Sequence, residues 1–197
     1  MAIDFWFSIG STYSFLTVMR LRDVSSRVGI PFVWHPFNVR AIMREMGNSP
    51  FAGKPAKLDY MWRDIKRRSE GYGIKARLPA PYPIHKLELA NAVAAIAARE
   101  GWCEAYTVAS YKYWFQDGEE PGTEPNLSAS IKEAGQLPQE IILRAVGSEG
   151  IDALAEATDA AKGLGIFGSP NFVVGGDLFW GDDRLEDAIL SHRRQGL

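Results

Sequence analysis

Apolar residues fill almost every position of residues 3–9, and this short run predicts a strand buried on both faces. Gly10 ends the run. Ser11 follows directly, and apolar residues then recur at helical spacing to residue 28, which predicts a helix over 11–28 with Ser11 as its N-cap. The β-rich segment 30–37 predicts a second strand. A helix between two strands indicates a parallel βαβ unit.

The middle of the chain, residues 39–162, follows a helical pattern. Its clearest helices are predicted at 87–99, an alanine-rich amphipathic segment, at 102–115, where aromatic residues recur, and at 152–164. Proline-bearing loops are predicted at 48–55, 79–83 and 117–125.

The end of the chain returns to strand signals. Residues 171–174 and 178–180 flank Gly175-Gly176, which predicts a hairpin, and a helix with an acidic first turn follows from 181. A βαβ start, a helical middle and a ββα end predict an α/β fold, namely a thioredoxin-like sheet with an inserted all-helical domain. We expect the split thioredoxin-like domain at 1–38 and 165–197, and the helical insertion at 39–164.

Composition narrows the choice of partners and compartment. The 197 residues carry a formal net charge of -2, which argues against nucleic acid and anionic membranes as partners. No apolar run approaches the roughly 20 residues that span a bilayer, and the first residues lack a basic signal region, so a cytoplasmic location is expected. The single cysteine, Cys103, excludes an intrachain disulfide and a CxxC pair, and it is expected to be buried in a helix.

Several motifs, in order along nearly the whole chain, resemble the family that joins kappa-class glutathione transferases with 2-hydroxychromene-2-carboxylate isomerases, which are relatives of DsbA-type oxidoreductases. These motifs are DFWF at 4–7, GSTYS at 10–14, GNSP at 47–50, PAK at 55–57, YMWRD at 60–64, GIFGSPNF at 165–172 and FWGDDR at 179–184. The chain departs from the family at Thr12, where proline is usual, at Ser169, where valine is common, and at 118–125, which is unusually rich in acidic residues, glycine and proline.

The resemblance implies glutathione as cofactor and Ser11 as the catalytic residue. A small thiol has a pKa of roughly 8.5, so little thiolate exists at neutral pH. A hydroxyl and backbone N–H groups at a helix start would lower that pKa by about one to two units. For an isolated serine, a plain N-cap is the alternative.

The resemblance also implies where the rest of glutathione binds. Ser169 and Pro170 would form a cis-proline turn that pairs with the cysteinyl unit, although a trans proline at a strand entry is the alternative. Asp182 and Asp183 match positions that hold the γ-glutamyl end, but acidic residues in a first helical turn are commonly only caps. Asn48 and Lys57 match positions that reach the glycyl carboxylate, although a surface lysine alone is uninformative.

The activity implied is glutathione-dependent cis-trans isomerisation of 2-hydroxychromene-2-carboxylate to trans-o-hydroxybenzylidenepyruvate, in bacterial breakdown of naphthalene-type aromatics. A kappa-like glutathione transferase is the alternative, followed by a non-catalytic glutathione-binding protein and a thiol-disulfide oxidoreductase, which lacks its CxxC. Relatives imply a homodimer.

Other ionisable residues leave choices open. Arg63, Lys66 or Arg77 would meet the carboxylate of a small aromatic substrate. His35 is either structural or faces the cavity. His85 and His192 have no partners at metal-ligand spacing, so no metal is expected.

Overall fold

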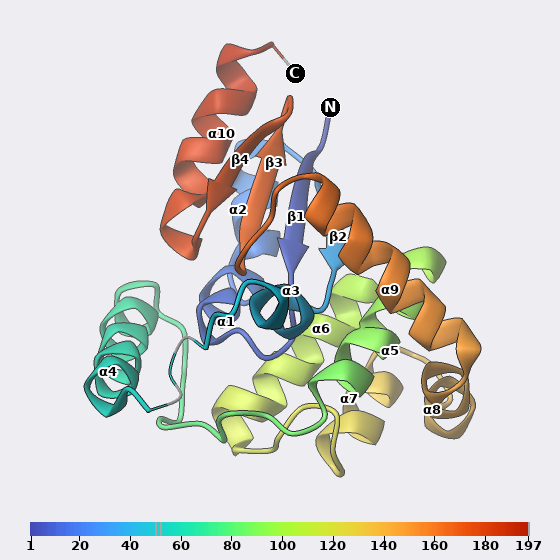
Figure 1. The fold of residues 1–197 in the computed structure, drawn as a ribbon. Helices are drawn as coiled ribbons and strands as arrows, with labels where there is room; N and C mark the ends of the chain where they lie inside the picture. Colours follow the sequence, from blue (N-terminus) through green and yellow to red (C-terminus); the bar gives the residue numbers. More distant parts are fainter. Residues whose placement is uncertain (50, 52, 197) are drawn as a thin grey trace.

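A computed structural model describes residues 1–49, 51 and 53–196 of the chain; Pro50, part of one of the motifs above, lies outside the described residues. The structure is mixed α/β, with a four-stranded sheet and many helices (Figure 1). The strands are β1 (Ile3–Phe7), β2 (Phe32–Pro36), β3 (Asn171–Val174) and β4 (Asp177–Trp180).

The sheet has the order β2-β1-β3-β4. β1 runs parallel to β2, which confirms the predicted βαβ unit, and antiparallel to β3. β3 and β4 form the predicted hairpin, with Gly175 and Gly176 at its turn, where both residues have positive φ angles. The first strand ends at Phe7, two residues earlier than predicted.

The prediction of one helix over 11–28 is wrong. Two helices occupy this segment, α1 (Thr12–Val18) and α2 (Leu21–Val28), and the chain leaves helical geometry at Arg20, where φ is -119°. The guanidinium of Arg20 pairs with Asp182 and Glu186 near the other end of the chain. This long-range ion pairing accompanies the break, and nothing in the local sequence signals it.

Helices fill the region between β2 and β3, as predicted. They are α3 (Val39–Glu45), α4 (Pro55–Gly71), α5 (Leu87–Glu100), α6 (Cys103–Lys112), a π-helical turn (Tyr113–Asp117), α7 (Asn126–Glu133), α8 (Pro138–Val146) and α9 (Ser148–Gly163). After β4, a 3-10 turn (Asp182–Arg184) leads into α10 (Leu185–Arg194). α9 contacts β2 of the predicted thioredoxin-like domain as well as the helices α3, α5 and α8. These contacts do not assign α9 to one domain, so the domain boundary near residue 164 stays a prediction.

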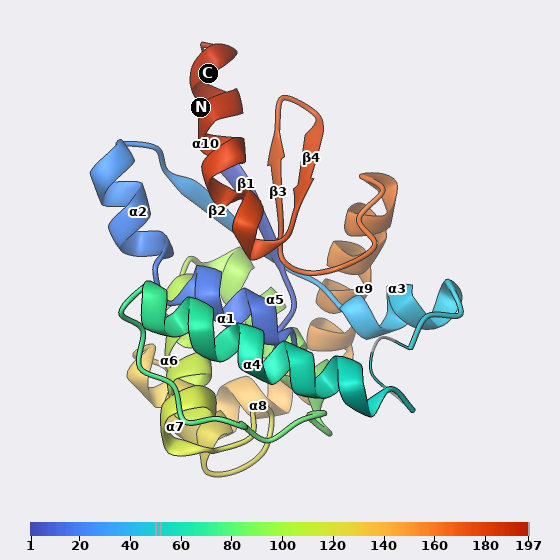
Figure 2. The same cartoon turned by 90° about the vertical axis from the view of Figure 1, so that its left-hand side faces the viewer.

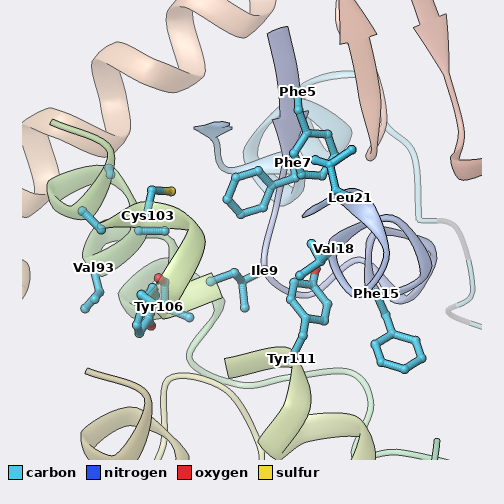
Figure 3. Close-up of a cluster of buried hydrophobic side chains, with 14 of the residues drawn as sticks. Phe5, Phe7, Ile9, Phe15, Val18, Leu21, Val93, Cys103, Tyr106 and Tyr111 are labelled. Atoms are coloured by element: carbon cyan, nitrogen blue, oxygen red, sulfur yellow. Dashed lines mark hydrogen bonds between the residues drawn. The ribbon is translucent and has the colours of Figure 1, made fainter. Parts of the chain in front are cut away.

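One large core joins the sheet to the helices. Phe5 and Phe7 of β1, Phe15 of α1, and Tyr106 and Tyr111 of α6 are fully buried in it (Figure 3). Because the sheet and the helical part share this core, packing against the helices fixes the end of β1. None of the helices in the described ranges is long and apolar enough to cross a membrane.

Candidate active site

The N-terminus of α1 lies beside the segment that enters β3. Ser11 is the N-cap of α1, as predicted, and its Oγ accepts a hydrogen bond from the Ser14 N–H at 3.3 Å. The same hydroxyl donates to the Ser169 carbonyl oxygen at 2.9 Å. Ser11 and Ser169 are half-buried, so residues separated by 158 positions form one accessible polar site.

The first backbone donors of α1 are available at this site. Within residues 1–49, 51 and 53–196, the N–H groups of Thr12 and Tyr13 have no hydrogen-bond acceptor. Such groups at a helix start favour an anion. Burial and the neighbouring Asp64 carboxylate raise the pKa of the Tyr13 hydroxyl, which keeps this phenol neutral and donating to Asp64 at 3.1 Å.

A small hydroxyl cluster binds the two segments together. The Ser8 N–H donates to Ser169 Oγ at 2.9 Å, and the Ser14 and Ser169 hydroxyls lie 2.8 Å apart. Ser8 and Ser14 are fully buried. The peptide bond between Ser169 and Pro170 is cis, as the resemblance implied. Valine at 169 has no hydroxyl for these contacts, so the serine in this chain has a structural role of its own.

Two buried side chains of the helical part hold the loop before Ser11. Asn91 Oδ1 accepts from the Ile9 N–H and Asn91 Nδ2 donates to the Ile9 carbonyl, both at 2.8 Å. The Tyr111 hydroxyl lies 3.0 Å from the Ser8 carbonyl oxygen and 3.1 Å from that of Ser11, and burial raises its pKa. The sequence analysis missed both residues, although a lone asparagine in an alanine-rich helix was a visible signal.

Asp182 lies under the surface at the start of the last helical segment. Its carboxylate accepts from Thr17 Oγ1 at 2.8 Å and pairs with Arg20 and Arg68, so both oxygens have partners. Burial raises the pKa of the Asp182 carboxyl, while the charges of Arg20 and Arg68 oppose this change. An ammonium group bound by Asp182 would compete with two arginines.

Asp183, by contrast, is exposed. It pairs with Arg184 at 3.1 Å, and its Oδ1 lies above Gly181, only 2.5 Å from the position that a Cβ would take there. Gly181 has a φ of 118° and donates its N–H to the Pro170 carbonyl at 2.9 Å. The accessible carboxylate of this pair is therefore that of Asp183, beside the proline turn.

Asn48, between α3 and α4, and Lys57, in the first turn of α4, are both exposed. Neither side chain has a hydrogen-bond partner among the residues that the structure describes, and Lys57 Nζ lies 5.5 Å from the centre of the Phe51 ring. Among the described residues, the side-chain hydrogen bonds of Ser11 are with Ser14 and Ser169, and none joins it to Asn48 or Lys57. Figure 2 shows α4 crossing in front of α1, and the two helices are in contact.

Half-buried aromatic rings line the side of α4 near α1. Thr12 Oγ1 donates to the sulfur of Met61 at 3.0 Å, which brings α4 onto the start of α1. The next residue, Trp62, meets the Tyr82 ring at 6.0 Å between centres, and Tyr82 meets Phe51 at 5.8 Å. We call Phe51, Trp62 and Tyr82 the aromatic face.

The histidines have ordinary structural partners. His35 Nε2 lies 3.0 Å from Asp4 Oδ1, and its ring stacks on Trp6. His85 contacts Glu120, and His192 contacts the carbonyl of Met1. In the described part of the chain, no three histidine, cysteine or acidic side chains cluster as a metal site.

A groove of about 520 Å³ lies elsewhere on the protein. It is bounded by α3, α5, α8 and α9, and Ser11, Ser169 and the other candidate residues do not line it. The candidate active site is therefore the start of α1 and not this groove.

Comparison with known proteins gives consistent matches. The model of the DSBA-like thioredoxin domain matches residues 2–189. The chain is similar to a 2-hydroxychromene-2-carboxylate isomerase of Sphingobium xenophagum, with 26% identity over 187 residues that cover 93% of this chain and 94% of that protein. It is also similar to glutathione S-transferase kappa 1 of Caenorhabditis elegans, with 26% identity, 93% of this chain and 87% of that protein being covered. A solved structure of 2-hydroxychromene-2-carboxylate isomerase has the same fold, with a TM-score of 0.87, 24% identity and coverage of 100% and 98%.

Proposed function

Since the chain belongs to the family of DSBA-like thioredoxin domains, we propose that it is a member that works with glutathione, as an isomerase of 2-hydroxychromene-2-carboxylate in bacterial aromatic catabolism. The product is trans-o-hydroxybenzylidenepyruvate. Full-length similarity to isomerases of that name supports the proposal. The observation that carries it is the half-buried Ser11 hydroxyl at the start of α1, opposite the Ser169 carbonyl, in a chain without a redox cysteine pair.

The site fits a thiol ligand. The free N–H donors at the start of α1 favour an anion, and the protein's own cysteine cannot supply a thiolate there. Cys103 is buried in α6, and burial raises the pKa of its thiol to about 12. Bound glutathione supplies a thiolate that adds reversibly to the conjugated substrate, so that the former double bond rotates before elimination. The protein's part is to bind, to orient and to stabilise charge.

Ser11 stabilises the thiolate by donating its hydroxyl hydrogen. A serine hydroxyl has one hydrogen, and here Ser11 directs it to the Ser169 carbonyl. A ligand amide that takes this carbonyl as its acceptor releases the Ser11 hydroxyl for the sulfur. The N–H groups of Thr12 and Tyr13 add two further donors.

The remaining predicted residues bind the two ends of glutathione. Asp183 receives the γ-glutamyl ammonium, while the buried Asp182 holds Arg20 and Arg68 by ion pairs. Asn48 and Lys57, which have no side-chain hydrogen-bond partners in the described ranges, take the glycyl carboxylate.

The aromatic face receives the arene of the substrate. Phe51, Trp62 and Tyr82 present half-buried rings with edge-to-face contacts, an arrangement that accepts a further flat ring. Its position against the α1 start, through Met61 and Thr12, supports a substrate arene bound near Ser11.

An ultraviolet assay of 2-hydroxychromene-2-carboxylate, with and without glutathione, tests the proposal. We expect turnover that requires glutathione without consuming it. Absence of turnover with either cis or trans isomer as substrate would contradict the isomerase function.

The similarity to a kappa glutathione transferase favours a second candidate function. In that case the same assay, followed by mass spectrometry, yields a released glutathione conjugate of an electrophilic substrate, and the glutathione concentration falls with time. The two functions therefore differ in the fate of glutathione.

A further inference from the structure

Arg40, on α3, is a half-buried arginine that the candidate site does not yet include. One terminal nitrogen donates to the Ile84 carbonyl oxygen at 2.8 Å. No carboxylate lies within ion-pair distance of Arg40 among residues 1–49, 51 and 53–196, whereas Arg44, one turn later, pairs with Glu88 at 3.5 Å. A guanidinium has five N–H donors, so most of those of Arg40 remain available.

Ile84 connects Arg40 to the loop before Ser11. Ile84 is buried, and its Cδ1 lies 3.3 Å from the position that a Cβ on Gly10 would take. Gly10 directly precedes Ser11. The carbonyl that holds the guanidinium and the side chain that packs on the loop therefore belong to the same residue.

Tyr82, a ring of the aromatic face, lies two residues before Ile84, whose carbonyl oxygen holds the Arg40 guanidinium. Burial raises the pKa of the Tyr82 hydroxyl, and the positive charge of Arg40 partly opposes that change. Arg40 is therefore anchored to the same segment of chain as Tyr82, and Tyr82 is the ring that contacts both Phe51 and Trp62.

The three cations that the sequence suggested for the substrate carboxylate are less suitable. Arg63 and Arg77 are exposed, and Arg77 donates to the Asp117 carbonyl. Lys66 is exposed and paired with Glu70. A half-buried charge without a counter-ion is costly, so a bound anion gains more from Arg40 than from these exposed groups.

We propose that Arg40 binds the carboxylate of an aromatic 2-oxo or 2-hydroxy acid whose ring lies on the aromatic face. This inference rests on the proposed function and names the residue that selects its substrate class. Held by Ile84, the guanidinium fixes the carboxylate end while the conjugated carbon faces the Ser11 site. Arg40 therefore determines specificity and does not activate the thiol.

The test compares Arg40→Gln with Arg40→Lys and with Arg63→Gln as matched control. Dissociation constants are measured by calorimetry for trans-o-hydroxybenzylidenepyruvate, for its neutral methyl ester and for glutathione. Arg40→Gln should weaken binding of the acid by about 10- to 100-fold and leave the ester and glutathione within about twofold. Arg40→Lys should be intermediate, because it keeps the charge and loses the planar fork. Arg63→Gln should match the wild type.

Equal weakening of acid and ester would mean that Arg40 only supports Ile84, and it would overturn the inference. Unchanged binding of the acid to Arg40→Gln would overturn it as well. Turnover by the wild-type protein is measured in parallel. If Arg40→Gln selectively loses binding of the acid but the wild type shows no turnover, the isomerase function is refuted and the carboxylate site at Arg40 is retained. A wild type that binds no aromatic acid would refute both the isomerase function and the carboxylate site.

Discussion

Removing the Ser169 hydroxyl should destabilise the protein through the loop before α1. In Ser169→Ala, the Ser8 N–H loses its acceptor at 2.9 Å and the Ser14 hydroxyl loses its partner at 2.8 Å. Both serines are fully buried, so water cannot replace the missing group without local opening. An unsatisfied buried donor costs about 1–3 kcal/mol, which we expect as the loss in unfolding free energy.

Urea unfolding followed by tryptophan fluorescence measures this loss. For a chain of this length, 1–3 kcal/mol corresponds to a fall in Tm of about 2–12 °C. Ser26→Ala, a serine exposed on α2, is the control and should stay within about 0.5 kcal/mol of the wild type. In a double-mutant cycle, Ser14→Ala combined with Ser169→Ala should cost less than the sum of the two changes, since both partners are then absent. A Ser169→Ala protein as stable as the wild type would refute the reasoning.

Three further changes test separate parts of the account. The Cys103 thiol should resist aromatic disulfide reagents at pH 8 until urea is added. Its pKa in the folded protein, about 12, exceeds the value of roughly 8.5 in the unfolded chain. The contribution of this thiol to stability is therefore complete below pH 8.5 and is lost as the pH rises towards 12. Between pH 8 and 10, Cys103→Ala should therefore lose about 1–2 kcal/mol less stability than the wild type, and parallel curves would contradict this. Asp183→Asn should raise the Kd of glutathione about 3- to 10-fold by calorimetry while leaving that of cysteinylglycine unchanged; an equal effect on both ligands would exclude a γ-glutamyl role. Asn91→Leu should cost about 2–4 kcal/mol in urea unfolding, because it removes both hydrogen bonds to Ile9, and a cost below 1 kcal/mol would refute its anchoring role.

Local signals in the sequence were sufficient for most of the fold. Gly175-Gly176 between two short apolar runs predicts the hairpin, and Ser11 before an apolar periodic segment predicts the N-cap, because both depend on neighbouring residues only. The break at Arg20 is not predicted, and the ion pair with Asp182 that accompanies it spans 162 positions. Sequence spacing carries no information on such a contact.

The candidate site shows the same difference between local sequence signals and long-range contacts. Ser11 and the Ser169–Pro170 turn were found through the family motifs, and the structure brings them together. Arg40 was missed, since an arginine in a helical pattern is indistinguishable from a solvated one until the Ile84 carbonyl is placed against it. The exposed carboxylate of Asp183 and the buried one of Asp182 are also distinguished only by the three-dimensional structure.

The central claim is that Ser11 and the start of α1 lower the pKa of a bound thiol. The ultraviolet absorbance of the thiolate, titrated with glutathione bound to the wild type, to Ser11→Ala and to Ser26→Ala, measures that pKa directly. We predict a value about one to two units below that of free glutathione for the wild type and Ser26→Ala, and a return towards the free value for Ser11→Ala. The same pKa for bound glutathione in Ser11→Ala and the wild type would contradict the account.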